Sequence, residues 1–135
     1  LREEVLAMRR KMADAHEGKS ELFDLKHDPG GLIDVEFIVQ FLVLGHSWEY
    51  PELTGNKGNI ALLKFAADRG LIPALLADTV RNAYREYRRM QHALRLNNLP
   101  GRVEPAMVAS QTTAVRKLWA HVFGDAAYGI SLILP

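Results

Sequence analysis

Apolar residues recur along this chain with helical spacing, most densely between residues 32 and 47. Within that stretch they fall on two faces of a helix. These are Ile33, Phe37, Phe41 and Leu44 on one face, and Val35, Val39 and Leu42 on the other. A helix that is apolar on two faces is normally buried at the centre of a bundle. We therefore predict a central helix over about residues 32–47, whose narrow polar stripe contains Glu36, Gln40 and Ser47.

Four further segments show the same periodicity and predict helices. They are residues 1–15, 60–69, about 73 to the break at 97–101, and a helix within 105–123 that is most secure over 112–122. Asn59 is suited to cap the helix that follows it, Pro73 suits the first turn of the longest helix, and Gly70 and Gly124 are expected to end helices. The expected fold is all-α, a bundle of about five helices in which the longest packs along the buried central helix at a shallow angle.

Two helices carry expectations about single side chains. The apolar face of the first helix is expected to comprise Val5, Met8 and Met12. The basic run at residues 9–11 could contact phosphate, but it is more typical of a solvated helix face. Phe37 in the central helix and Trp119 in the last helix are expected to lie in the core.

The segment before the central helix combines a short extended run with a chain reversal. Residues 22–26 are too few for a stable strand on their own. Because no partner strand is evident, we expect them to form a loose edge. Pro29 biases Asp28 away from helical angles, while Gly30 and Gly31 permit backbone angles closed to other residues. We expect a tight reversal here.

Composition bounds the class of protein. With 48% hydrophobic and 24% charged residues and a formal net charge of +1, the 135 residues are expected to form a single domain that does not bind nucleic acid generally. The longest apolar stretch falls short of the roughly 20 residues that span a bilayer. The absence of cysteine excludes disulfides and Cys-based zinc sites, and fits a cytoplasmic protein.

The chain does not begin with methionine, so we expect a fragment of a longer protein. Its expected parts are a leading helix and loop at 1–21, a core bundle at 22–124 and a tail at 125–135.

Asp34 and Glu36 are candidate chemical groups near the start of the central helix. On a strand, carboxylates at this spacing can share a metal ion, but on a helix they point about 200° apart. The five histidines include no pair at i, i+4, so no metal site is expected. One interpretation is structural: Asp34 caps backbone N–H groups near Gly30, and Glu36 pairs with a buried cation. The other is that both contact a nucleotide or a neighbouring domain.

Lys26 and the two glycines form a second candidate site. A glycine turn that leads into a helix start, with a lysine nearby, can hold phosphate oxygens. The Walker pattern is absent. The alternative is that the glycines only allow the chain to reverse.

One side of the longest helix is basic. It carries Arg81, Arg85, Arg88, Arg89, His92 and Arg95. Such a stripe fits either a solvated face or a docking face for carboxylate or phosphate groups of a partner. Glu86 lies within the stripe and can pair with Arg85 or Arg89.

Residues 24–40 resemble the glutamine synthetase adenylyltransferase family, in the segment that follows its nucleotidyltransferase core. The family pattern is close to D-L-K-x-x-x-G-G-x-x-D-x-E-F-x-x-Q. It is matched here by Asp24, Leu25, Lys26, Gly30, Gly31, Asp34, Glu36, Phe37 and Gln40. The sequence IDVEFIVQ, which follows DPGG, resembles that of the C-terminal, AMP-attaching half of these two-part enzymes. The PII uridylyltransferases have a similar helical domain, to which a weaker match is expected.

The resemblance implies a helical domain next to a catalytic domain that transfers AMP from ATP, with Mg²⁺, to a tyrosine of glutamine synthetase. The family core carries a G-S pattern followed by D-x-D, and neither occurs here. The chain alone is therefore expected to be inactive, with no catalytic residue, metal or cofactor of its own. The residues expected to face the nucleotide or the catalytic domain are Lys26, Gly30, Gly31, Asp34 and Glu36.

Two alternatives stay open. The chain could be a docking module that binds the PII signalling protein or glutamine synthetase through Arg81, Arg85, Arg88, His92 and Arg95. An unrelated helical-bundle enzyme is the weakest interpretation, because no metal constellation is evident. The expected partners are thus the preceding nucleotidyltransferase domain, glutamine synthetase and PII, without nucleic acid or membrane.

Overall fold

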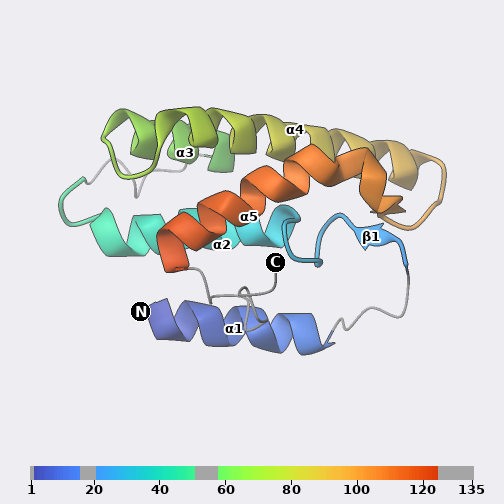
Figure 1. The fold of residues 1–135 in the computed structure, drawn as a ribbon, viewed down its shortest axis with the longest axis horizontal. Helices are drawn as coiled ribbons and strands as arrows, with labels where there is room; N and C mark the ends of the chain where they lie inside the picture. Colours follow the sequence, from blue (N-terminus) through green and yellow to red (C-terminus); the bar gives the residue numbers. More distant parts are fainter. Residues whose placement is uncertain (1, 16–20, 51–57, 125–135) are drawn as a thin grey trace.

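The computed structural model describes residues 2–15, 21–50 and 58–124, and these residues are mostly helical (Figure 1). The α-helices are α1 (Arg2–Ala15), α2 (Leu32–His46), α3 (Asn59–Asp68), α4 (Ala74–Leu96) and α5 (Ala109–Phe123). The shorter elements are the strands β1 (Phe23–Asp24) and β2 (Arg102–Val103) and the 3₁₀ helix η2 (Pro105–Val108). The all-α prediction is confirmed. None of the described helices combines the length and apolar character that a membrane crossing requires.

Helix α2 is central, as the sequence predicted. It contacts α1, α3, α4 and α5, and Figure 1 shows α1 on one side of it, α3 and α4 on the other, and α5 running obliquely across α2. Its fully covered side carries Val35, Ile38, Val39 and Leu42. Helices of this kind are held by packing rather than by their own propensity.

The face of α2 that carries Phe37, Phe41 and Leu44 is less buried than predicted. Phe37 and Phe41 are half-buried and Leu44 is 52% exposed. The prediction that Phe37 is buried in the core was therefore wrong: Phe37 packs against the core but is only half-buried. The physical reason is that Phe37 lies at an open surface pocket beside Met12 of α1, where no helix covers it completely.

Helices α4 and α5 complete the core. The inner side of α4 buries Ala77, Val80, Ala83, Tyr84 and Tyr87. Helix α5 contributes Trp119 and Phe123, whose ring centroids lie 4.4 Å apart, so the burial of Trp119 is confirmed.

The ends of the helices largely follow the sequence signals. Gly70 and Gly124 come just after α3 and α5 with φ angles of +75° and +102°, as expected of glycines that end helices. Pro73 immediately precedes α4. Asn59 does not cap α3, because Gly58 occupies the cap position and no side chain bonds there. The amide of Asn59 donates instead to the hydroxyl of Tyr84.

The extended run before α2 is paired, not loose. Strand β1 pairs antiparallel with β2, with Phe23 opposite Val103 and Asp24 opposite Arg102. The N–H of Leu25 also donates to the carbonyl of Gly101, at 3.0 Å. The prediction of an unpaired edge failed because its partner has only two residues and follows α4, far away in sequence.

Helix α1 buries only part of the predicted face. Val5 is buried as predicted, but Met8 is 53% exposed, and Leu6 and Arg9 are buried instead. The basic run is solvated at residues 10 and 11, but Arg9 is only 4% exposed. The reason is a buried acidic partner, described below, that lies 25 positions further along the chain.

Three predictions concern segments outside the described residues. They are the loop at 16–20, most of the loop before α3 at 51–57, and the tail at 125–135. The division of the chain into these parts stays a prediction.

Replacing Trp119 by Ala should lower the free energy of unfolding by about 3–5 kcal/mol, because it empties a fully buried aromatic site. Trp48 is a matched control, since its side chain is 81% exposed, and Trp48→Ala should cost less than about 0.5 kcal/mol. Urea unfolding of the chain measures both. Equal losses at the two tryptophans would contradict the assignment of the core.

Candidate functional site

The turn between β1 and α2 is held by its own backbone and by the carboxylate of Asp24. The N–H groups of Leu32 and Ile33 donate to the carbonyls of Leu25 and Lys26, at 2.8 and 3.0 Å. An oxygen of Asp24 accepts from the N–H groups of Lys26 and His27, at 2.9 and 3.0 Å. These bonds lie within the reversal itself and close the turn locally.

The charge of Asp24 is favoured by this arrangement. Burial by itself would raise the pKa of the Asp24 carboxyl. The N–H groups of His27 and Lys26, together with the side chain of His27, outweigh that effect and leave the pKa below its usual value. The carboxylate therefore stays ionised and keeps accepting hydrogen bonds at neutral pH.

The two glycines are required by the close approach of other atoms. A Cβ at Gly31 would lie 2.6 Å from the carbonyl oxygen of Leu25, which is a backbone atom that cannot move aside alone. Gly30 has a φ of +91°, and Thr112 of α5 lies against it at 3.1 Å from an ideal Cβ. This supports the alternative that the glycines serve the chain reversal, and adds close packing with α5 as a second reason.

Asp34 lies at the centre of the turn and is completely buried. One of its oxygens accepts from the N–H of Gly30 at 2.7 Å, which confirms the predicted cap. The other oxygen forms an ion pair with Nε of Arg9, and Arg9 donates further to the carbonyl of His27 at 2.6 Å. The buried cation that the sequence assigned to Glu36 therefore pairs with Asp34 instead.

Helices α4 and α5 also reach this turn. The hydroxyl of Tyr87 in α4 donates to the carbonyl of Gly30 at 2.7 Å. Burial, and then the negative charge of Asp34, raise the pKa of Tyr87 far above its usual value, so the hydroxyl keeps its proton. Nε of Arg116 in α5 donates to the carbonyl of Pro29 at 3.4 Å. We refer to Arg9, Gly30, Asp34 and Tyr87 together as the buried clamp.

The other chemically interesting residues of the turn lie outside the buried clamp. Lys26, Glu36 and Gln40 are exposed. They line one surface pocket of about 280 Å³, together with Met12, Ile33 and Phe37. We refer to these six residues as the Lys26 pocket. The structure therefore separates the predicted site residues: Lys26 and Glu36 lie at the surface, while Gly30, Gly31 and Asp34 are buried behind them.

Glu36 does have a partner within the fold, although not a cation. The hydroxyl of Tyr84 in α4 donates to Oε2 of Glu36 at 3.2 Å. The same hydroxyl accepts from Nδ2 of Asn59 at 2.9 Å. The carboxylate of Glu36 is thus exposed, and one of its oxygens accepts a hydrogen bond from the buried phenol of Tyr84.

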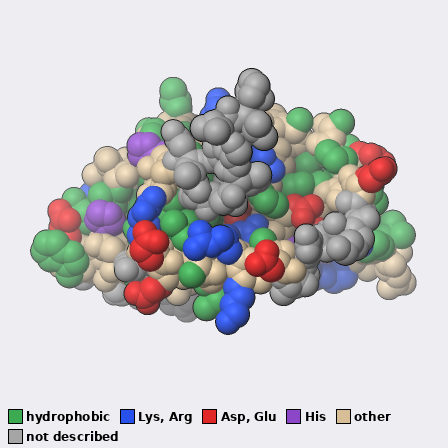
Figure 2. All heavy atoms as spheres, turned by 60° about the horizontal axis from the view of Figure 1, so that its bottom comes forward, with side chains coloured by type: hydrophobic (Ala, Val, Ile, Leu, Met, Phe, Trp, Pro, Cys, Tyr) green, Lys and Arg blue, Asp and Glu red, His purple; other side chains and the backbone are tan. Residues whose placement is uncertain are grey.

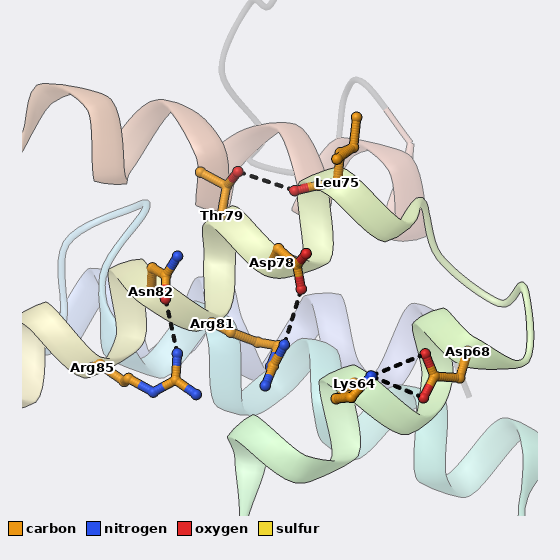
Figure 3. Close-up of polar contacts among 8 residues, drawn as sticks. All are labelled: Lys64, Asp68, Leu75, Asp78, Thr79, Arg81, Asn82 and Arg85. Carbon is orange, nitrogen blue, oxygen red and sulfur yellow. Dashed lines mark hydrogen bonds and ion pairs between the residues drawn. The ribbon is translucent and has the colours of Figure 1, made fainter.

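Several of the basic side chains on α4 contact other side chains of the same helix. Figure 3 shows Arg81 directed at Asp78 and Arg85 at Asn82, at 2.9 and 2.8 Å. Arg89 pairs with Glu86, as the sequence suggested, and this pairing lowers the pKa of the Glu86 carboxyl. These contacts favour a solvated face. Arg88 lies over the ring of Tyr84 at 5.9 Å, and His92 and Arg95 are exposed, so a docking role for the stripe stays a prediction.

The face that carries α1 has a mixed charge. Figure 2 shows basic and acidic side chains side by side on its described part, with no large area of one sign. Among residues 2–15, 21–50 and 58–124, no group of three acidic or histidine side chains could hold a metal ion.

Sequence reasoning missed three side chains that build the site. Arg9 was hidden in a basic run that resembled a solvated face, and neither Tyr84 nor Tyr87 was singled out on the longest helix. A usable signal was present for the tyrosines, because a buried phenol hydroxyl normally needs a hydrogen-bond partner. No local pattern identified which partner each would have.

Comparison with known proteins gives similarity over most of the chain. A family model described as GlnD PII-uridylyltransferase matches residues 3–118. The bifunctional glutamine synthetase adenylyltransferase/adenylyl-removing enzyme of Aromatoleum aromaticum is 63% identical over 126 residues, which are 93% of this chain and 13% of that protein. The proteins of the same name from Bordetella bronchiseptica and Nitrosomonas eutropha are 50% and 49% identical, over 93% and 92% of this chain. The resemblance found in the sequence is confirmed, and the chain spans about 13–15% of the length of these relatives.

Replacing Gly31 by Ala should lower the free energy of unfolding by about 1–3 kcal/mol or more, because the added methyl group collides with backbone. Gly45 in α2 is the control, since nothing lies within 4 Å of its ideal Cβ. Gly45→Ala should be neutral or stabilise by about 0.5–1 kcal/mol, since alanine favours the helix. Urea unfolding distinguishes the two, and a tolerated Gly31→Ala would contradict the close approach to Leu25.

Proposed function

The chain belongs to the GlnD PII-uridylyltransferase family, and from this membership we propose that it is the helical domain next to the nucleotidyltransferase core of a glutamine synthetase adenylyltransferase. The observation that carries the proposal is the 63% identity over 126 residues with a protein of that name. The parent enzyme would transfer AMP from ATP to a tyrosine of glutamine synthetase, and its other half would remove it. We further propose that the chain comes from the C-terminal, AMP-attaching half and acts in the cytoplasm.

The chemical step is assigned to the preceding domain rather than to this chain. Both oxygens of Asp34 accept hydrogen bonds inside the fold, from Arg9 and from Gly30. Glu36 lies two positions further along the same helix, where the two side chains point about 200° apart. Within the described residues, Asp34 and Glu36 therefore do not fit a Mg²⁺ site, and the metal would be held by the preceding domain.

The proposed role of this chain is to present the Lys26 pocket to that domain and its nucleotide. Lys26 is exposed, and a lysine ammonium suits the phosphate oxygens of ATP. Phe37 and Met12 provide an apolar surface beside it, of the kind that a neighbouring domain can cover. The backbone that carries Lys26 is fixed by its carbonyl, which accepts from the N–H of Ile33 at the start of α2.

Binding of PII or glutamine synthetase through the arginine stripe is a separate proposal. It receives less support, since Arg81, Arg85 and Arg89 already have partners on their own helix. Glutamine synthetase would meet the parent enzyme as the substrate of the preceding domain.

In the full-length parent enzyme, Lys26→Ala should lower AMP transfer by at least about tenfold, equivalent to about 1.4 kcal/mol of transition-state stabilisation. Thermal unfolding should hardly change, because an exposed lysine contributes little to stability. Lys64→Ala is the matched control, since Lys64 is an exposed lysine that pairs with Asp68 on its own helix. AMP transfer to purified glutamine synthetase measures the effect. Unchanged transfer by the folded Lys26→Ala enzyme would exclude the proposed role of the pocket.

A further inference from the structure

A chain of two hydrogen bonds connects three helices to the Lys26 pocket. Nδ2 of Asn59, the first residue of α3, donates to the hydroxyl of Tyr84 in α4 at 2.9 Å. That hydroxyl donates in turn to Oε2 of Glu36 in α2 at 3.2 Å. Glu36 lines the pocket with Lys26 and Gln40. The two bonds are continuous, so the start of α3 is linked to an exposed carboxylate on α2.

The direction of the chain follows from the chemistry of its members. An amide NH₂ group can only donate, whereas a phenol can accept one hydrogen bond and donate another. Because Asn59 donates to the phenol oxygen, the single proton of Tyr84 is left for the carboxylate of Glu36. Tyr84 is 4% exposed, so water has little access to compete for that proton.

The contact restricts a side chain that would otherwise be mobile. Glu36 is exposed on the outside of α2, where a glutamate can adopt many rotamers. Tyr84 holds Oε2, while Oε1 makes no hydrogen bond to any other described residue and is available to an external donor. One oxygen therefore fixes the orientation of the carboxylate of Glu36, a residue that lines the pocket together with Lys26.

We propose that Tyr84 and Asn59 are positioning residues that orient Glu36 toward a hydrogen-bond donor on the nucleotidyltransferase domain of the parent enzyme. The inference rests on the proposed function, since it requires that domain to cover the Lys26 pocket. It adds that the contact depends on Tyr84, which is buried in α4, and on Asn59, which is half-buried at the start of α3.

The experiment compares Tyr84→Phe, Glu36→Ala and the double variant in the full-length enzyme. Each single change should lower kcat for AMP transfer by about fivefold to tenfold, the size expected for a hydrogen bond to a charged group. The double variant should be no worse than Glu36→Ala alone, because Tyr84 acts only through Glu36. Tyr50→Phe is the control, since the hydroxyl of Tyr50 makes no hydrogen bond within the described residues, and it should leave kcat unchanged.

Two substitutions of Asn59 provide a readout that a purely structural role would not give. Asn59→Asp replaces the donor by an acceptor, which draws the phenol proton away from Glu36, so it should lower kcat as much as Tyr84→Phe. Asn59→Ala leaves the proton free to reach Glu36, so it should lower kcat less. If Tyr84→Phe fails to fold, the two Asn59 variants test by themselves whether Tyr84 positions Glu36.

Several results would overturn the inference. They are full activity of folded Tyr84→Phe or Glu36→Ala enzyme, losses that multiply in the double variant, or equal effects of the two Asn59 substitutions. If the wild-type enzyme transfers no AMP to glutamine synthetase, the proposed function is wrong. In that case the affinity of the same variants for Mg²⁺–ATP, measured by titration calorimetry, tests whether Tyr84 and Asn59 position Glu36. The double variant should then bind no more weakly than Glu36→Ala alone.

Discussion

The structure depends most on the buried ion pair between Arg9 and Asp34. Both side chains are removed from water, with Arg9 4% exposed and Asp34 fully covered. Taking charges out of water is costly, and it is tolerated only where the pair is also hydrogen-bonded. Here the N–H of Gly30 donates a hydrogen bond to the second oxygen of Asp34, and the carbonyl of His27 accepts a hydrogen bond from Arg9. The pair thereby joins α1 to the turn that leads into α2.

The same constraint explains why one segment contains both structural and exposed polar residues. The turn must bring its backbone within reach of Asp34, which requires Gly31 against Leu25 and a positive φ at Gly30. Once closed, the turn leaves Lys26 outside and directs its carbonyl into the first turn of α2. A lysine on such a backbone has little freedom except in its own side chain, which is useful for contact with another domain. Rigid support of this kind is what contact residues generally need.

The sequence was sufficient for features that depend on neighbouring residues, and insufficient for those that depend on distant ones. The central helix, the long helix and the glycines at 70 and 124 follow from local spacing and from backbone angles. The partner of Arg9 is 25 positions away and that of Tyr87 is 57 positions away. Nothing in the local pattern selects such pairs.

The candidate site shows the same limit. The matched pattern of residues 24–40 singled out this segment, but it gave no indication of which members were buried. Carboxylates two positions apart on a helix point in different directions, and only the fold shows that Asp34 points inward and Glu36 outward. A two-residue strand such as β2 is too short to leave a recognisable signal, so the partner of β1 was missed as well.

The central claim is that the Arg9–Asp34 pair holds the turn, and a double-mutant cycle in the 135-residue chain tests it most directly. Urea unfolding is measured for wild type, Arg9→Met, Asp34→Leu and the double variant. Each single change should cost about 3–5 kcal/mol, because it leaves an uncompensated buried charge. The double variant should cost clearly less than the sum of the two, by at least about 1 kcal/mol. Small single losses that simply add would show that the pair does not hold this structure together.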